Sequence, residues 1–377
     1  MALDVLALSG ELTGVGRFCS GLSAALADRD ELELHPYAVA KHAASATRAP
    51  LVALGLDAKT WPVPARLANS VWARADWPPI EWLVGAVEVV HGTNYVVPPA
   101  RHAARVVTVH DLTALRYPEM CVPASLAYPR LVARAARQGA FVHVPSGFVR
   151  DEVIELLAVA PDRVRIVPHG VDGPQARTAG SLVGPGRGAS RTRPAPYVLA
   201  LGAVEPRKDL PTLVKAFAEI APANGELELV VAGPEGWGTE PFSAAVAASG
   251  VSGRVVRLGY LEESARLELL SGALVLAYPS LYEGFGFPPL EAMAAGVPVV
   301  ATAAGAIPEV VGDAAELVAP GDVSALAGAL ERVISDEALR ARLVSAGHAR
   351  VARFTWAGAA GAMSELYSQA ALERRSR

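Results

Sequence analysis

The chain has 377 residues, so at about 150 residues per domain we expect two or three domains. Apolar residues make up 52% of the sequence and charged residues 19%, which excludes a chain that is disordered throughout. The net charge of −4 argues against a protein that mainly binds nucleic acid. The two cysteines, Cys19 and Cys121, exclude a disulfide framework and a four-cysteine zinc site.

No apolar run reaches the roughly 18 residues that a helix needs to span a bilayer. The N-terminus lacks a basic leader region and meets Asp4 at once, which is typical of a first strand and not of a signal peptide. We therefore expect a globular protein of the cytoplasm.

Short valine-rich runs alternate with helical patterns through the first half of the chain. The strands are predicted at 3–8, 32–40, 87–91, 105–109, 141–145 and 164–167. One helix is predicted to end near residue 27, and two more are predicted to span 124–138 and 147–159. Because parallel neighbours need a crossover, this alternation predicts βαβ units and a parallel sheet.

A stretch rich in glycine, proline and arginine interrupts this pattern at 173–196. Its composition favours a solvated linker, so we predict an N-terminal domain over 1–175 and a linker over 176–196. A second series of strands is predicted at 197–201, 227–232, 255–258, 274–278, 297–301 and 317–318. This series predicts a C-terminal domain over 197–355, followed by a helix over 356–377 that packs back on the N-terminal domain.

Each half therefore reads as a doubly wound, Rossmann-like α/β domain. In such sheets the ligand lies at the carboxyl ends of the strands. Two such domains facing each other would form an interdomain cleft, which is the expected place for a substrate.

Two carboxylates stand eight residues apart in the segment 278–298. Glu283 falls in a loop with glycines, and Glu291 falls in the first turn of the helix that follows. Carboxylates accept hydrogen bonds from sugar hydroxyls, while glycine amides and a helix N-terminus donate to an anion. The segment therefore suits a ligand with both hydroxyls and phosphate. For Glu291 the alternative is a carboxylate that only complements the helix dipole.

Adjacent basic residues, Arg207 and Lys208, follow a predicted strand and precede a helix. A guanidinium grips phosphate in bidentate fashion, and an ammonium adds a point charge. The alternative is a solvated basic turn without a ligand.

A glycine turn, Thr13-Gly-Val-Gly16, opens the first helix. Glycines allow a backbone to approach phosphate closely. Cys19 stands where a dinucleotide fingerprint has its third glycine, so that class of site is weakly indicated. A turn that serves packing alone is the alternative.

His110 and Asp111 end the predicted strand at 105–109 and should lie at the same sheet edge. A metal would need further ligands nearby, and no H-E-x-x-H spacing supports one. Without other signals a lone histidine is more often structural than functional. Asp111 is expected to orient His110 or to cap the next loop, and Asn94 to contact a substrate or to form a turn.

The segment from Glu283 to Glu291 resembles the E-x7-E motif of retaining glycosyltransferases with the GT-B architecture, in particular glycosyltransferase family 4. Further blocks match in the family's order. They are Thr13–Phe18, Val109–Thr113, Val167–Asp172, Leu201–Leu210 and Gly305–Gly312. The resemblance covers nearly the whole chain and is specific because the blocks occur together.

The resemblance implies two facing Rossmann-like domains and a retaining hexosyltransferase that needs no cofactor and no metal. GDP-mannose is the favoured donor, with α-mannosyl transfer to a glycan, lipid-linked or small-molecule acceptor. The alternatives are a UDP- or dTDP-sugar-dependent transferase and a non-catalytic subunit that binds nucleotide-sugar. Another enzyme of this architecture, such as an epimerase or a phosphorylase, is a further alternative.

The resemblance also implies roles for residues. The implied catalytic residues are His110, Glu283, Arg207 and Lys208, and the implied acceptor-binding residues are Asn94 and Asp111. The implied donor-binding residues are Gly14, Val15, Gly16, Gly202, Arg207, Lys208, Tyr260, Leu261, Ser280, Glu283, Gly284, Phe285, Gly286, Phe287 and Glu291. Transfer would be a same-face substitution in which the leaving diphosphate takes the acceptor's proton.

Three arginines, Arg130, Arg134 and Arg137, are spaced along one predicted helix. Such a stripe is typical of a solvated face, and contact with anionic lipid is the alternative. It matters because some members of the family act on lipid acceptors at the cytoplasmic leaflet. The expected location is therefore cytoplasmic, with peripheral contact at the inner membrane face left open.

Overall fold

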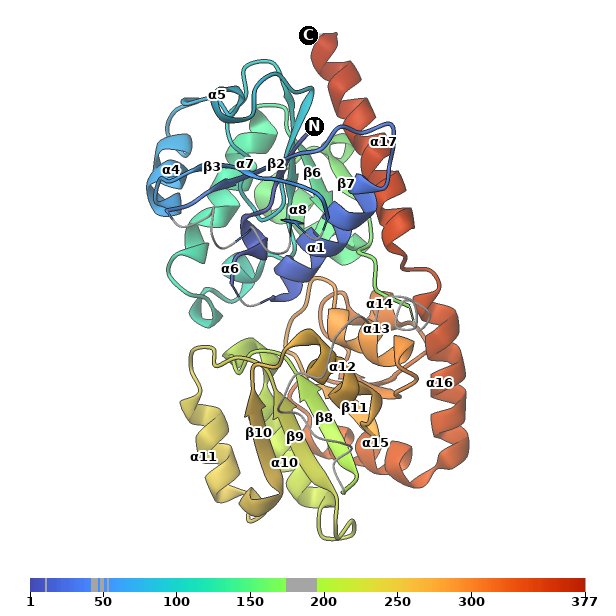
Figure 1. The fold of residues 1–377 in the computed structure, drawn as a ribbon. Helices are drawn as coiled ribbons and strands as arrows, with labels where there is room; N and C mark the ends of the chain where they lie inside the picture. The colour runs from blue at the N-terminus through green and yellow to red at the C-terminus, as the bar shows by residue number, and fades with distance from the viewer. Residues whose placement is uncertain (11, 42–46, 48–50, 53, 174–194, 377) are drawn as a thin grey trace. The chain divides into compact units, whose positions relative to one another are not determined.

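The computed structural model describes residues 1–10, 12–41, 47, 51–52, 54–173 and 195–376, which form two compact units (Figure 1). The first unit is Met1–Gly170 together with Phe354–Arg377, and the second is Val171–Arg353. These boundaries lie within a few residues of the predicted ones at 175 and 355. Of the predicted linker 176–196, only residues 195 and 196 lie within the described part.

A seven-stranded parallel sheet forms the centre of the first unit, in the order β3-β2-β1-β4-β5-β6-β7. Its strands are β1 (Ala2–Asp4), β2 (His35–Val39), β3 (Lys59–Trp61), β4 (Val89–Gly92), β5 (Ala104–Thr108), β6 (Phe141–Val144) and β7 (Val164–Ile166). The strand order reverses at β1 and β4, and ligands of doubly wound sheets bind at such a switch point.

The predicted strand at 3–8 is too long. β1 ends at Asp4, whose Oδ1 accepts a hydrogen bond from the amide of Leu6 at 2.9 Å. A short polar side chain that bonds the backbone two residues on competes with the strand ladder. The chain therefore turns into the 3₁₀ helix η1 (Leu6–Leu8).

Helices cover this sheet on both sides (Figure 1). They are α1 (Gly14–Ala27), α4 (Ala65–Trp72), α5 (Glu81–Val84), α6 (Thr113–Arg116), α7 (Tyr128–Arg137), α8 (Gly147–Leu157) and α17 (Trp356–Arg375), with the 3₁₀ helices η2 (Pro118–Met120), η3 (Ser125–Ala127) and η4 (Pro161–Arg163). The helix predicted at 124–138 is thus divided into η3 and α7. Proline lacks an amide proton and is favoured in a first helical turn, which explains why α7 begins beside Pro129.

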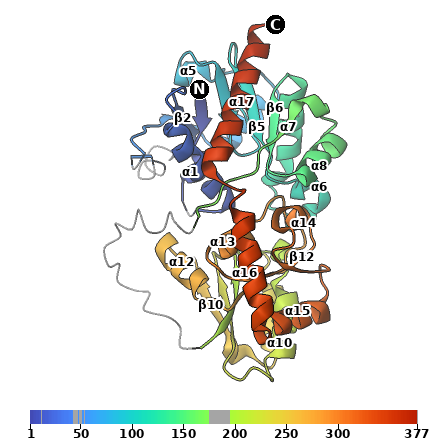
Figure 2. The ribbon, with the colours of Figure 1, turned by 90° about the vertical axis from the view of Figure 1, so that its right-hand side faces the viewer.

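The last helix, α17, packs against α1, β4 and β5 of the first unit (Figure 2). The indole of Trp356 occupies the space above Gly21, where a methyl group would overlap the ring. Thr355 caps the helix, since its hydroxyl accepts a hydrogen bond from the amide of Gly358 at 3.1 Å.

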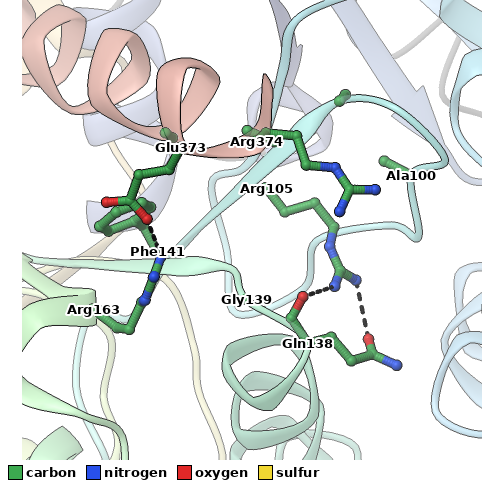
Figure 3. A pocket seen from close by; sticks show the side chains of 11 residues that line it. Ala100, Arg105, Gln138, Gly139, Phe141, Arg163, Glu373 and Arg374 are labelled. Carbon is green, nitrogen blue, oxygen red and sulfur yellow. Dashed lines mark hydrogen bonds and ion pairs between the residues drawn. The ribbon is translucent and has the colours of Figure 1, made fainter. Parts of the chain in front are cut away.

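Charged side chains fix the other end of α17 (Figure 3). The carboxylate of Glu373 lies 2.8 Å from the guanidinium of Arg163, and Arg374 donates to the carbonyls of Arg101 and His102. Arg105 lies beside them and donates to Gln138. The helix therefore belongs to the first unit along its whole length.

A six-stranded parallel sheet forms the centre of the second unit, in the order β10-β9-β8-β11-β12-β13. Its strands are β8 (Tyr197–Leu201), β9 (Glu228–Ala232), β10 (Val255–Gly259), β11 (Val275–Tyr278), β12 (Val299–Thr302) and β13 (Glu316–Val318). Its helices are α10 (Leu210–Ile220), α11 (Glu240–Ala248), α12 (Glu263–Ser271), α13 (Phe287–Ala294), α14 (Ile307–Val311), α15 (Val323–Ser335) and α16 (Glu337–Val351), with η5 (Pro206–Lys208) and η6 (Ser252–Arg254). The amphipathic helix α10 buries Leu213, Val214 and Phe217 against α15 and the sheet.

Candidate functional site

The carboxyl ends of β8 and β11 bring the basic pair and the first glutamate together. β8 and β11 are hydrogen-bonded neighbours although their paired residues, such as Val198 and Val275, stand 77 positions apart in the sequence. The loop after β8 forms η5, which carries Arg207 and Lys208. The loop after β11 carries Glu283.

Glu283 is buried and binds both cations. Its Oε2 lies 2.7 Å from Nη1 of Arg207, and its Oε1 lies 2.6 Å from Nζ of Lys208. Lys208 also donates to the hydroxyl of Tyr278 at 2.9 Å, and Arg207 to the carboxylate of Glu205 at 2.7 Å. Each cation is thus held by two side chains, which fixes both in position before any ligand binds.

The charge state of Glu283 follows from these contacts. Burial alone would raise the pKa of its carboxyl, but the charges of Arg207 and Lys208 together outweigh that effect and lower the pKa to about 2. Burial, and then the negative charge of Glu283, raise the pKa of the Tyr278 phenol well above its usual value. At neutral pH Glu283 is therefore a carboxylate and Tyr278 a neutral phenol.

The glycine loop after Glu283 leads directly into α13. Gly286 has a φ of 104°, a conformation that favours glycine, and a Cβ there would come within 2.6 Å of the Ile307 side chain. α13 begins at Phe287, and the rings of Phe285 and Phe287 meet edge to face at 5.4 Å. Gly284 lies in the same loop. The five predicted donor residues 283–287 therefore form this loop and the first residue of α13.

Glu291 is bound by Arg266 of α12, a residue that no motif indicated. Nη1 of Arg266 lies 2.8 Å from Oε2 of Glu291, and its Nη2 donates to Oε1 at 3.2 Å. Arg266 also binds Glu263 at 2.8 Å. This bidentate pair fixes the orientation of the Glu291 carboxylate. Glu291 is the fifth residue of α13, so its predicted place in the first turn is wrong. The helix-dipole alternative fails with it, because that effect is confined to the first turn.

Two further predicted donor residues lie beside the cluster. Gly202 follows β8, and a Cβ there would come within 3.3 Å of the Lys208 side chain. Ser280 is buried in the loop after β11, and its carbonyl accepts a hydrogen bond from Thr302. Tyr260 and Leu261 follow β10, which is separated from β8 by β9. The donor role of these four residues stays a prediction.

In the first unit, His110 follows β5 and has a defined tautomer. Its Nε2 lies 2.8 Å from the carbonyl of Thr93, so the ring donates there, and burial lowers its pKa. The neutral ring therefore carries its proton on Nε2 and leaves Nδ1 as an acceptor. Phe18 of α1 packs edge to face on this ring at 5.2 Å.

Asp111 acts at least in part as a structural residue. Its Oδ1 accepts a hydrogen bond from the amide of Thr113 at 3.0 Å, at the beginning of α6, and its own amide donates to the Tyr95 hydroxyl at 3.1 Å. This is the capping role anticipated as one alternative. Asn94 lies in the loop after β4, directly before Tyr95, whose φ is 59°. The acceptor-binding role of Asn94 and Asp111 stays a prediction.

The glycine turn is the N-terminus of α1, with Thr13 as its cap. Gly16 is buried, and a Cβ there would come within 2.9 Å of the carbonyl of Ala7, which gives this glycine a packing reason. Gly14 is exposed and Val15 half-buried. Phe18, in the first turns of the same helix, contacts His110, so the turn and this histidine lie at one edge of the first sheet.

Of the three arginines on α7, Arg134 binds within the protein. It lies 2.9 Å from Asp76 and donates to the carbonyl of Trp72 at 3.2 Å, while Arg130 and Arg137 are exposed. No helix in the part of the chain that the structure describes is long and apolar enough to cross a membrane. Within the same ranges, no cluster of three His, Cys, Asp or Glu side chains is arranged to hold a metal ion. Metal-independent transfer stays a prediction.

Comparison with known proteins agrees with this geometry. The model of the family described as Glycosyltransferase Family 4 matches residues 12–173, and the model described as Glycosyl transferases group 1 matches residues 189–350. The chain is 29% identical over 271 residues to O-antigen chain mannosyltransferase B of Escherichia coli, covering 71% of each chain. It is 34% identical over 244 residues to MMP alpha-(1->4)-mannosyltransferase of Mycolicibacterium hassiacum, covering 63% of this chain and 56% of that relative.

The fold is also that of a solved structure. Sucrose-phosphate synthase from Thermosynechococcus elongatus superposes with a TM-score of 0.71 at 22% identity, covering 98% of both chains. Two Rossmann-like units, each with a parallel sheet, make up the GT-B fold. Each of the two units matches one of the two family models, and the chain belongs to the group 1 glycosyltransferases of family 4.

Proposed function

We propose that this protein is a retaining mannosyltransferase that moves an α-mannosyl group from GDP-mannose to a glycan, lipid-linked or small-molecule acceptor. The observation that carries the proposal is the binding of Arg207 and Lys208 to buried Glu283 at the carboxyl edge of the second sheet. Two similar proteins named as mannosyltransferases support the choice of sugar.

In the proposed reaction, the bond from the anomeric carbon to the diphosphate oxygen breaks while the acceptor hydroxyl bonds that carbon on the same face. The acceptor's proton passes to the departing phosphate oxygen. Arg207 and Lys208 stabilise the negative charge that grows on this diphosphate, and their fixed positions avoid reorganisation during the reaction. Two cations already bind Glu283. This supports a role for Glu283 in positioning them and argues against a role as a nucleophile.

His110 has a role consistent with its tautomer. Because Nε2 donates to Thr93, the free acceptor on Nδ1 accepts a hydrogen bond from a hydroxyl of the donor sugar. Glu291 accepts from the ribose alongside Arg266. The alternatives are a UDP- or dTDP-sugar donor, or a subunit that binds nucleotide-sugar without turnover.

Thermal unfolding with GDP, UDP, dTDP and ADP and their sugar conjugates tests the proposal. A ligand at a hundred times its Kd adds about 2.7 kcal/mol to the free energy of unfolding. Selective stabilisation by GDP and GDP-mannose supports the mannosyl donor, whereas stabilisation by another nucleotide keeps the enzyme class and replaces the donor. No stabilisation by any nucleotide contradicts the proposal.

The variant Lys208→Met removes one phosphate-binding cation and should abolish that stabilisation. Lys215→Met removes an exposed lysine of α10 and is the matched control, with stabilisation expected to match the wild type. Equal loss in both variants would contradict the assignment of Lys208.

A further inference from the structure

A small pocket of about 40 Å³ lies within the first unit, at the amino ends of β5, β6 and β7 (Figure 3). Arg105 lines it from the second position of β5, Arg163 from the end of η4 directly before β7, and Arg374 from the last turn of α17. His110 follows the other end of β5. The pocket therefore lies at the opposite edge of the sheet from the residues to which the transfer reaction is assigned.

Two of the three guanidinium groups have no carboxylate partner among the described residues. Arg105 donates to the side chain and to the carbonyl of Gln138, both at 3.1 Å. Arg374 donates to the carbonyls of Arg101 and His102. Neither guanidinium forms an ion pair with a described aspartate or glutamate. The acceptors that they do have are uncharged, so these two positive charges are not neutralised at contact distance.

The third guanidinium, that of Arg163, is neutralised and fixed. Its Nη1 lies 2.8 Å from the carboxylate of Glu373, and its Cζ lies 4.7 Å from the centre of the Phe141 ring. Three cations and one carboxylate line the pocket, which leaves two positive charges without a counter-charge. Both belong to the neighbouring guanidinium groups of Arg105 and Arg374.

The positive charge of Arg105 is unfavourable in this setting. Burial lowers the pKa of its guanidinium, and the charges of Arg374 and Arg134 lower it further, against the opposing effect of Asp76 and Glu81. An arginine keeps its proton in proteins, so the folded chain bears this cost. An anion that binds both Arg105 and Arg374 would offset their repulsion.

The volume limits the ligand to a small group. One water needs about 10–15 Å³ of such space, so 40 Å³ holds only a few heavy atoms. A tetrahedral phosphate group has this size, whereas a six-membered ring does not fit, since benzene occupies a cavity of about 150 Å³. Guanidinium groups bind phosphate through paired N–H···O hydrogen bonds. A phosphate monoester carries a charge of about −1.5 to −2 at pH 7, which matches the two free positive charges.

We infer that Arg105 and Arg374 bind a phosphate group, as the free ion or as the terminal group of a phosphate monoester. The bound phosphate joins the last turn of α17 to the beginning of β5. No residue of the second unit takes part, so the inference is independent of Arg207 and Lys208 and does not rest on the proposed function.

The test follows the ¹³Cζ resonance of Arg105 in the full chain labelled at the arginine side chains. This resonance is the one that Arg105→Lys removes. The ligands are inorganic phosphate and glycerol 1-phosphate, with singly charged dimethyl phosphate as the comparator, all at constant ionic strength because salt screens exposed charges. At least one of the first two should shift the resonance saturably, with a Kd on the order of millimolar. The one that binds more tightly identifies the ligand as the free ion or the monoester.

Two variants of adjacent residues on α17 supply the second measurement. Arg374→Gln should weaken binding about tenfold, the factor that a lost hydrogen bond to a charged group brings. Arg375→Gln is the matched control, because it removes the same charge from an exposed residue that pairs with Glu88 and does not line the pocket. Its Kd should stay within about twofold of the wild-type value, since solvent and salt screen a charge outside contact distance.

The inference is overturned if neither phosphate nor glycerol 1-phosphate shifts the Arg105 resonance saturably. Equal weakening by the two α17 variants, or equally tight binding of dimethyl phosphate, would overturn it as well. The wild-type titration is repeated with excess GDP and should give the same Kd. Loss of the response in GDP would place the phosphate at the nucleotide site instead and would also overturn the inference.

Discussion

The hydroxyl of Tyr367 on α17 lies 2.8 Å from Nδ1 of His91 on β4, and it is the donor of this bond. The direction follows from the other end of a buried chain. His143 donates from Nε2 to the carbonyl of Val167, so its Nδ1 accepts from Thr108, and the Thr108 hydroxyl accepts from Nε2 of His91. Nδ1 of His91 then has no proton and must accept.

Tyr367→Phe should destabilise the protein. It removes the donor and leaves Nδ1 of His91 buried without a partner, which costs about 1–3 kcal/mol in the free energy of unfolding. Denaturant titration measures the change. Ser368→Ala, at an exposed neighbouring position of α17, is the control and should change stability by less than about 0.5 kcal/mol. Equal stability of Tyr367→Phe and wild type would contradict the hydrogen-bond chain.

Stability should fall as the pH is lowered from about 6.5 toward 4. Burial lowers the pKa of His91, His110, His143 and His169, that of His143 to about 4. The unfolded chain therefore binds protons at a higher pH than the folded one, so the stabilisation is complete above pH 6.5 and is lost below it. Urea unfolding at pH 7.5 and pH 5 checks this, and equal free energies would contradict it.

Asp4 should act in the opposite direction. Burial raises the pKa of its carboxyl to about 7, from 3.8, so the folded state disfavours the charged form. Its contribution weakens the protein as the pH rises from about 4 to 7. Asp4→Asn, which can keep the oxygen that accepts from Leu6, should therefore stabilise the protein at pH 8 relative to wild type and lose this advantage at pH 4. A constant difference between the two proteins would refute the buried acid.

The same variant sharpens the histidine measurement. Tyr37 and Cys19 face Asp4, and its charge contributes to the raised pKa of both. As the pH falls through about 7, protonation of Asp4 in the wild type offsets part of the stability that the histidines lose. Asp4→Asn removes this offset, so the loss of stability between pH 7.5 and 5 should be larger than in wild type.

Glu283→Gln should abolish transfer and weaken the fold. The amide keeps the shape of the side chain but leaves Arg207 and Lys208 without their shared buried anion, at a cost of roughly 3 kcal/mol. Because the pKa of Glu283 is about 2, its stabilisation is complete above pH 4.5 and is lost as the pH falls toward 2. Assays of transfer and denaturant titration at pH 7 measure both effects.

Glu235→Gln is the matched control for that variant. Glu235 pairs with Arg257 at 3.0 Å but is 75% exposed, and surface pairs contribute about 0–1 kcal/mol. It should retain both stability and transfer. Transfer by Glu283→Gln at the rate of this control would contradict the site assignment.

The sequence predicted the alternation of strands and helices well because valine-rich runs and breaks by glycine and proline are local signals. β8 was predicted with its observed bounds. β3 was missed because it has only three residues and its first is exposed. β1 was predicted too long because the turn after it depends on one side-chain bond of Asp4, which apolar periodicity does not register.

The sequence predicted the motifs of the candidate site one by one. It did not predict the contacts between them, because these depend on the order of the strands in the sheet. Arg207 and Glu283 meet only because β8 pairs with β11, which no spacing reveals. Glu205 was overlooked although it stands two residues before Arg207 in the same loop, where the two side chains form an ion pair. Arg266 gave no signal at all, since its partner Glu291 lies on another helix.

The position of α17 has a consequence for synthesis of the chain on the ribosome. The second unit is a continuous stretch, so all of its residues are available before the last helix is made. The first unit begins earlier but is complete only when Phe354–Arg377 has emerged, because Trp356 and Tyr367 fill places beside α1 and β4. The surfaces of α1 and β4 that α17 covers therefore stay exposed while the second unit is translated. The domain that is encoded first is the one that finishes folding last.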